Sequence, residues 1–251
     1  MAPKSNLGKP DAIFSAVLAL ICIGAGYFVF AATGTLNRCT KEVGGQPLKE
    51  PPAVLVPVQF KNAKDLGVGK LLVASPNLAD PNFAKTVILL IHSDDHGIVG
   101  LILNRRTDLA LSQVLEGFPG TKDRSDTAYL GGPVEVPAVI ALLQSKDKVE
   151  GADLIFSGVY LISKKAPLEQ TLAARPDPQV FHVYLGYAGW STDQLLKEVE
   201  LGAWFIFPPD SGVVFNSDPA SLWQQMIRKT EQKIAGNAPV SVPPWTHAGQ
   251  P

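Results

Sequence analysis

The stretch His92-Ser93-Asp94-Asp95-His96 offers two imidazoles and two carboxylates within five residues. Two histidines four residues apart on a helix can share a zinc ion, with a carboxylate as a further ligand. The apolar runs at residues 86–92 and 98–104 are typical of strands, however, and would place His92 and His96 at opposite ends of a turn. We therefore interpret the stretch as a solvated hairpin turn. His92 and His96 are kept as weak metal candidates, and we expect no cofactor.

Signatures of nucleophilic catalysis and of nucleotide binding are absent from the sequence. It contains no G-x-S-x-G elbow and no P-loop, and the glycines at 67 and 69 open no G-x-G-x-x-G pattern. His182 alternates with apolar residues in a predicted strand, where a lone histidine is usually structural. The adjacent charges of Arg105 and Arg106 could bind a phosphate or a carboxylate, although a solvated turn is the commoner role of such a pair.

Two glycine-rich turns form the strongest candidate site. One is Gly131-Gly132-Pro133 after a predicted strand, and the other lies at residues 185–190, between a strand and a capped helix. Small residues allow the backbone to approach another group closely. That group could be a ligand, or it could be a helix that packs tightly on the sheet. The functional hypothesis is a pocket without catalytic residues. Its candidate binding residues are Asn104, Arg105, Gly131, Gly132, Pro133, Gly186, Tyr187 and Trp190.

Short, mixed elements must position these residues. Apolar runs and turn residues predict strands at 70–74, 86–92, 98–104, 127–130, 138–143, 159–163 and 181–187. Helices are predicted at 109–116 with Asp108 as the cap, from the capping box at Ser191 to about Leu201, and from Asp218-Pro219 toward Ile234. Because strands and helices do not alternate regularly, the pattern disfavours a doubly wound parallel sheet.

The composition excludes several classes of protein. The chain has 251 residues, 46% hydrophobic and 18% charged, which excludes a mainly disordered chain, a collagen and a multi-span transporter. Two cysteines exclude a disulfide-rich scaffold. The 22 basic and 23 acidic side chains give a net charge of −1, without the basic excess that duplex-binding proteins usually carry. The balance disfavours nucleic acid as a partner.

Residues 12–32 form a run of 21 residues without a charged side chain. As a helix this run would span about 30 Å, the thickness of the hydrocarbon core of a bilayer, so we predict one N-terminal transmembrane helix. Because the apolar region of a signal peptide is usually shorter, we favour a retained anchor over cleavage near Ala31 and Ala32. Basic residues on the two flanks nearly balance, but Lys4 and Lys9 ahead of the run favour a domain outside the cytoplasm.

The run divides the chain into five segments. They are an N-terminal flank at 1–11, the transmembrane helix at 12–32, a Pro- and Gly-rich tether at 33–66, one domain at 67–235 and a tail at 236–251 that we expect to be disordered. The domain carries 15 basic and 19 acidic side chains, whereas residues 1–66 carry 7 and 4. This asymmetry suits anchoring near anionic lipid headgroups.

Several motifs of the domain follow the order seen in a known family. They are Leu71-Leu72-Val73-Ala74-Ser75-Pro76, Gly100-Leu101-Ile102-Leu103-Asn104, Gly131-Gly132-Pro133-Val134, Leu185-Gly186-Tyr187-Ala188-Gly189-Trp190-Ser191 and Ala203-Trp204. On these residues the chain resembles the YqgE/AlgH family of bacterial proteins over about 67–230. The resemblance implies an α+β fold in which a bent, mostly antiparallel sheet forms a partial barrel with packed helices. It implies no established enzymatic activity and carries over no catalytic residue. Members are ordinarily soluble and cytoplasmic, so the apolar N-terminal run is a departure.

Three functional hypotheses follow. The leading one is a single-pass, membrane-anchored, non-catalytic binding or regulatory domain whose partner is an unknown protein or small molecule. The second is a hydrolase-like enzyme that uses the glycine-turn pocket near Asn104 and Trp190. The third is a transcription-related regulator, as some members of the family are described, although the acidic domain disfavours contact with nucleic acid.

Overall fold

The computed structural model describes residues 66–236, with side chains through Gln232. The strands in this range are β1 (Leu71–Ala74), β2 (Val87–Asp94), β3 (Gly97–Ile102), β4 (Arg106–Ala110), β5 (Thr127–Leu130), β6 (Val134–Gln144), β7 (Asp153–Phe156), β8 (Val159–Ile162), β9 (Phe181–Trp190) and β10 (Trp204–Phe207). The helices are α2 (Leu111–Val114), α3 (Lys165–Ala173), α4 (Thr192–Glu200), α5 (Ser211–Val214) and α6 (Pro219–Gly236).

The strands form one mostly antiparallel sheet that does not close into a barrel. Its main path runs β10-β1-β2-β3-β9-β6-β8-β7, and β4 joins β5, which pairs with β9. The β5–β9 pairing is parallel, and the other pairings in the described residues are antiparallel. The structure thus confirms the predicted α+β class and the mostly antiparallel sheet.

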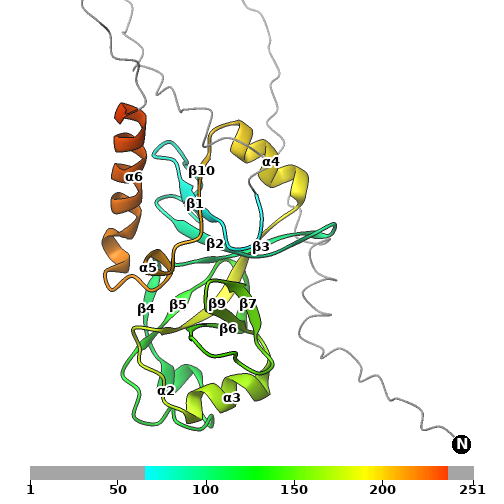
Figure 1. Ribbon diagram of the computed structural model, residues 1–251, viewed down its shortest axis with the longest axis vertical. Helices are drawn as coiled ribbons and strands as arrows, with labels where there is room; N and C mark the ends of the chain where they lie inside the picture. The colour runs from blue at the N-terminus through cyan, green and yellow to red at the C-terminus, as the bar shows by residue number, and fades with distance from the viewer. Residues whose placement is uncertain (1–65, 237–251) are drawn as a thin grey trace, which may run out of the picture.

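Strand β9 connects the two halves of the fold (Figure 1). Its earlier residues pair with β6 and β5, whereas Ala188, Gly189 and Trp190 pair with β3. Between these stretches lies Gly186, whose φ of +68° falls in the left-handed region that favours glycine. The sheet therefore changes direction within β9, with α4 and α6 beside one half and α2 and α3 beside the other.

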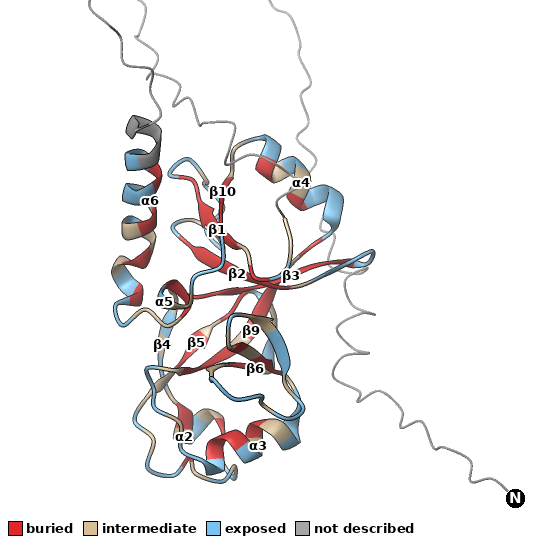
Figure 2. Ribbon diagram, in the orientation of Figure 1, coloured by how far each residue is buried: buried red, intermediate tan, exposed pale blue. Residues whose placement is uncertain are grey.

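Helices cover the sheet and bury three apolar clusters (Figure 2). Helix α4 packs Leu195 and Val199 into one cluster, and α6 packs Leu222 and Met226 into another. Helix α3 contributes to the third cluster, in the half of the molecule that holds β6 and β8. Burial of these apolar side chains is the main favourable term that holds the elements together.

Two of the three predicted helix starts are confirmed. The side chain of Ser191 accepts a hydrogen bond from the backbone N–H of Gln194 at 3.2 Å, and α4 follows. The side chain of Asp218 accepts one from the backbone N–H of Ser221 at 3.3 Å, and α6 begins at Pro219. Strand β3 is buried along its whole length, in agreement with its nearly continuous apolar character.

Several predicted elements were wrong in extent. Strand β6 starts at Val134 instead of residue 138, and β9 continues to Trp190 instead of ending at residue 187. Helix α2 covers only Leu111–Val114 of the predicted 109–116, and Asp108 lies in β4 instead of capping it. The reason is tertiary, because β4 pairs with β5 and the backbone N–H of Leu111 donates to the carbonyl of Asp126 at 2.9 Å. The first hairpin turn is also tighter than predicted, because β2 continues to Asp94 and β3 starts at Gly97.

Four segments lie outside the described residues, namely 1–11, 12–32, 33–65 and 237–251. The predicted transmembrane helix falls among them and stays a prediction. Within residues 66–236, no helix is both long enough and apolar enough to cross a membrane.

Candidate functional site

Asn104 links two segments of chain at the end of β3. Its Oδ1 accepts a hydrogen bond from the backbone N–H of Val87 at 2.9 Å, and its Nδ2 donates to the carbonyl of Lys85 at 2.9 Å. The neighbouring Arg105 donates to the carbonyl of Pro81 at 3.0 Å. Both side chains therefore secure the segment that leads into β2.

The predicted turn at residues 185–190 is wrong, because these residues belong to strand β9. The turn Gly131-Gly132-Pro133 packs against β9 where that strand bends. The backbone of Gly131 and Gly132 lies against residues 186–188, and a Cβ atom on Gly132 would overlap the carbonyl group of Tyr187. A Cβ atom on Gly186 would lie 2.7 Å from the carbonyl oxygen of Val134. These glycines permit two backbone segments to pack closely, and Pro133 follows them at the surface.

Tyr187 lies beside this crossing and is almost completely buried. Its hydroxyl and Oε1 of Glu135 are both inaccessible to solvent, and Glu135 is the polar group that acts on the hydroxyl. Burial, together with the charge of Glu135, raises the pKa of Tyr187 to about 12. The tyrosine therefore stays protonated at physiological pH.

Trp190 belongs to a different part of the core, under α4. The Oε2 atom of Glu198 accepts hydrogen bonds from the indole N–H groups of Trp190 at 3.2 Å and Trp204 at 2.8 Å. Its Oε1 atom accepts one from Nε2 of Gln194 at 2.9 Å. The ring of Phe83 stacks on Trp190 with centroids 5.4 Å apart. One carboxylate on α4 thus fixes both indoles.

The predicted site residues therefore fall into three surroundings. The structure brings together Gly131, Gly132, Gly186 and Tyr187, and it places Trp190 in the core under α4. Asn104 and Arg105 line a pocket of about 570 Å³ beside the start of α6, and Arg106 and Ser217 also line it. Their roles in binding stay predictions.

A larger pocket, of about 640 Å³, lies between the start of β9, strands β4 and β5, and the segment that contains α5. We call it the β9 pocket. Its volume falls within the usual range for small-molecule sites, roughly 300–1,000 Å³. Its lining residues include Arg106, Tyr129, Gln144, Gln179, His182 and Asn216.

A stack of aromatic rings forms one wall of the β9 pocket. The rings of Tyr129 and His182 are stacked with centroids 4.7 Å apart. The ring centroid of Phe215 lies 5.2 Å from that of His182. The hydroxyl of Tyr184 approaches Nδ1 of His182 at 3.5 Å. His182 is only 9% exposed, and burial is the main cause that lowers its pKa to about 4, with the charge of Arg106 acting in the same direction.

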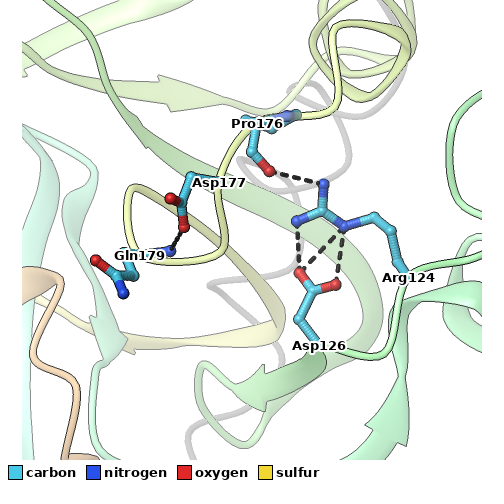
Figure 3. A network of polar contacts seen from close by, with 5 residues as sticks. All are labelled: Arg124, Asp126, Pro176, Asp177 and Gln179. Atoms are coloured by element: carbon cyan, nitrogen blue, oxygen red, sulfur yellow. Dashed lines mark hydrogen bonds and ion pairs between the residues drawn. The ribbon is translucent and has the colours of Figure 1, made fainter.

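A largely buried ion pair between Arg124 and Asp126 adjoins the β9 pocket (Figure 3). Nε of Arg124 lies 2.9 Å and 3.1 Å from the two carboxylate oxygens of Asp126, and Nη2 lies 2.6 Å from Oδ2. Nη1 donates to the carbonyl of Pro176 at 3.0 Å, which ties the segment before β9 to the same group. Asp126 lines the pocket, and its charge is compensated in place by Arg124.

Arg106 supplies a second guanidinium to the β9 pocket. It lies opposite Tyr129 in the β4–β5 pairing, and its Nε donates to Oγ1 of Thr127 at 2.8 Å. Among residues 66–236, no carboxylate lies within ion-pair distance of it. Arg106 is exposed, so the pocket carries one solvated guanidinium without a carboxylate partner in the described part of the chain.

The titration of these groups suits binding better than proton transfer. A histidine with a pKa of about 4 is neutral at pH 7 and is a weak base, whereas a general base works best with a pKa near the working pH. Burial also raises the pKa of Tyr129, so its hydroxyl stays a hydrogen-bond donor. Neutral His182, protonated Tyr129 and cationic Arg106 together can recognise a ligand at physiological pH.

The metal candidates lie at the first hairpin. Nε2 of His92 lies 2.9 Å from Oδ2 of Asp94, and Nδ1 of His96 lies 3.9 Å from Oδ1 of the same residue. The hydrogen bond with His92 is the main cause that lowers the pKa of Asp94. Across residues 66–236, no three His, Cys, Asp or Glu side chains are grouped so that they could hold a metal ion.

Comparison with known proteins places this architecture in a family. The AlgH-like family profile matches residues 71–235. The chain belongs to the AlgH-like family. A UPF0301 protein of Streptomyces avermitilis is 34% identical to it over 66% of this chain and 88% of its own. One of Chlorobium luteolum is 32% identical over 72% of this chain and 95% of its own.

Two solved structures resemble this AlgH-like chain. The AlgH protein of Pseudomonas aeruginosa matches with a TM-score of 0.54 and 27% identity, over 69% of this chain and 95% of that one. A protein of Corynebacterium diphtheriae matches with a TM-score of 0.56 and 23% identity, over 65% of this chain and 87% of that one, which supports the fold alone. The function of the AlgH-like family is uncharacterised, so the comparisons establish membership and architecture.

Sequence reasoning missed the β9 pocket in this AlgH-like domain. It noted the charge of Arg106 but treated His182 as structural, because nothing local connects residues 106, 129 and 182. One signal was available. Three buried strand positions carry side chains with a polar group, although purely apolar side chains are more usual in a core. They are Tyr129, His182 and Tyr184.

Proposed function

We propose that this chain is a membrane-tethered, non-catalytic binding domain whose small-molecule ligand occupies the β9 pocket. The observation that carries the proposal is the aromatic and cationic wall formed by Arg106, Tyr129 and His182. Its groups are fixed by strand pairing and stacking before a ligand arrives, which lowers the ordering cost of binding. The low pKa of His182 argues against proton transfer there at physiological pH.

The tethering part of the proposal is supported by the sequence of the N-terminal segments. Residues 12–32 carry no charge over a length that spans a bilayer as a helix. The Pro- and Gly-rich residues 33–66 would act as a spacer between the membrane and the domain. The proposed topology places the domain outside the cytoplasm.

Ligand binding can be tested by saturation-transfer NMR on the full chain in nanodiscs, with a fragment set that contains anionic, neutral and cationic members. The variant Gln179→Trp fills the pocket from an exposed lining position, and Gln113→Trp makes the same change at an exposed position on α2. We expect fragments whose signal disappears with Gln179→Trp and persists with Gln113→Trp. If every fragment signal survives Gln179→Trp, the β9 pocket is not the site.

The tether can be tested by fractionation and protease accessibility in cells, with a variant lacking residues 12–32 as the control. We expect the full chain in the membrane fraction, with cleavage of the domain once the outer barrier alone is opened, and the deleted form in the soluble fraction. Full-length protein in the soluble fraction would contradict anchoring. Cleavage only after complete lysis would place the domain in the cytoplasm.

A further inference from the structure

We infer that the ligand of the β9 pocket is a small polar molecule that carries an oxyanion, a carboxylate or a phosphate, bound by Arg106 and the hydroxyl of Tyr129. The inference rests on the proposed function and adds the chemical class of the ligand. It follows from the charges of the lining residues, from one unpaired hydroxyl and from the character of the remaining wall.

The charges of the lining favour an anion. The two ionised side chains among the lining residues are Arg106 and Asp126. Asp126 is held by three contacts from Arg124, and both side chains of that pair are largely buried. The ion pair with Arg124 reduces the repulsion of an incoming anion by Asp126, whose charge still acts on Tyr129 and His182. The charge of Arg106 has no acidic partner among the described residues.

The guanidinium of Arg106 is also held in position for an oxyanion. Its Nε donates a hydrogen bond to Oγ1 of Thr127 at 2.8 Å, which fixes the plane of the guanidinium. Its two Nη groups make no hydrogen bond to another described residue. Planar N–H donors of this kind match the paired oxygens of carboxylate and phosphate groups.

Tyr129 provides a second donor beside the cation. The residue is 6% exposed, and its hydroxyl makes no hydrogen bond with any residue in the described range. The charge of Arg106 acts on this hydroxyl, which places the two groups near each other. The hydroxyl is not among the polar atoms closed to solvent, so it can donate a hydrogen bond to an oxyanion that binds at Arg106.

The remaining lining residues indicate the polarity of the rest of the ligand. It consists mainly of neutral amides and hydroxyls, with some aromatic surface; the polar members are Gln144, Gln179, Ser211, Asn216 and Ser217. Such groups hydrogen bond to a polar, uncharged body. The volume of about 640 Å³ is far larger than a bare oxyanion requires.

The test compares matched probes on the full chain in nanodiscs by isothermal titration calorimetry. The pairs are glucose 6-phosphate with glucose, and benzoate with benzamide, and inorganic phosphate alone measures the contribution of a bare anion. We expect the anionic member of each pair to bind more tightly, and glucose 6-phosphate to bind more tightly than inorganic phosphate. Affinity should fall as salt concentration rises.

Variants separate the proposed contacts from general charge. Arg106→Gln should weaken binding of the anionic probes roughly 10- to 100-fold, and Tyr129→Phe by about tenfold, since hydrogen bonds to a charged group are the stronger class. Arg228→Gln removes the same charge from an exposed position on α6 and should leave affinity within about twofold. Arg106→Lys keeps the charge without the planar donors and should lie between wild type and Arg106→Gln.

Three outcomes overturn the inference. They are neutral members binding as tightly as their anionic partners, equal losses from Arg228→Gln and Arg106→Gln, and anion binding that persists in Gln179→Trp. Neutral or cationic fragments could bind to wild type and lose binding in Gln179→Trp. The β9 pocket would then be a binding site, as proposed, but the inferred anionic class of its ligand would be wrong. If no probe of any charge depends on the pocket, both fail.

Discussion

Gly132 lies directly against the carbonyl group of Tyr187, at the point where the turn after β5 crosses the bend of β9. Tyr187 is buried, and both segments are held by strand pairing, so neither backbone can move away cheaply. The glycine is therefore required by backbone packing. The same crossing joins the half of the sheet that carries the β9 pocket to the half covered by α4 and α6.

Gly132→Ala should lower the free energy of unfolding by about 1–3 kcal/mol or more, because its methyl group overlaps backbone atoms of Tyr187. Gly189→Ala is the matched control in β9, the strand against which Gly132 packs; there a Cβ atom would lie 3.7 Å from the Tyr187 ring, an ordinary contact. Urea denaturation of both variants measures the difference. Equal stability of the two would refute the packing argument.

Asn104→Asp should destabilise the domain by about 1–3 kcal/mol, because the new carboxylate can accept from Val87 but cannot donate to the carbonyl of Lys85. Asn104→Ala loses both bonds and should cost at least as much. Asn82→Ala, at an exposed position nearby, should change stability by less than about 0.5 kcal/mol. Thermal unfolding provides the comparison, and a wild-type melting temperature for Asn104→Asp would exclude the structural role.

Glu198→Ala should destabilise the domain by about 2–3 kcal/mol, because it leaves the indole N–H groups of Trp190 and Trp204 without their acceptor. Tryptophan fluorescence should also shift, since both rings would change their surroundings. Glu200→Ala removes an exposed carboxylate two residues away on α4 and serves as the control. Unchanged fluorescence and stability in Glu198→Ala would show that the two indoles do not depend on this carboxylate.

His182 should make stability fall in mild acid. Its pKa is about 4 in the folded protein and 6.5 ordinarily, so the unfolded chain binds more protons between these values. The stabilisation by neutral His182 is complete above about pH 6.5 and is lost as the pH falls toward 4, on the order of 3 kcal/mol in total.

The variant His182→Phe isolates this contribution. It should lose stability less steeply than wild type between pH 6.5 and 4, whereas His96→Phe, at an exposed position on the first hairpin, should follow wild type. Denaturant unfolding at several pH values measures the slopes. Identical slopes for wild type and His182→Phe would show that His182 titrates normally.

The sequence by itself determined the features that depend on neighbouring residues. Capping side chains at Ser191 and Asp218 marked the starts of α4 and α6, because a helix N-terminus is satisfied by groups two or three residues away. The buried strands β2 and β3 followed from their apolar runs. Family motifs in the correct order identified the AlgH-like domain, which the profile match at 71–235 confirms.

Tertiary structure alone decided which residues share a site. Asn104, Gly132 and Trp190 were grouped because each stands in a constrained motif, but the fold assigns them to a strand connection, a backbone crossing and the core under α4. The β9 pocket brings together Arg106, Tyr129 and His182, which are far apart in the chain. Strand pairing over long sequence separations sets such contacts, and no local pattern encodes them, because register depends on how whole strands bury their faces.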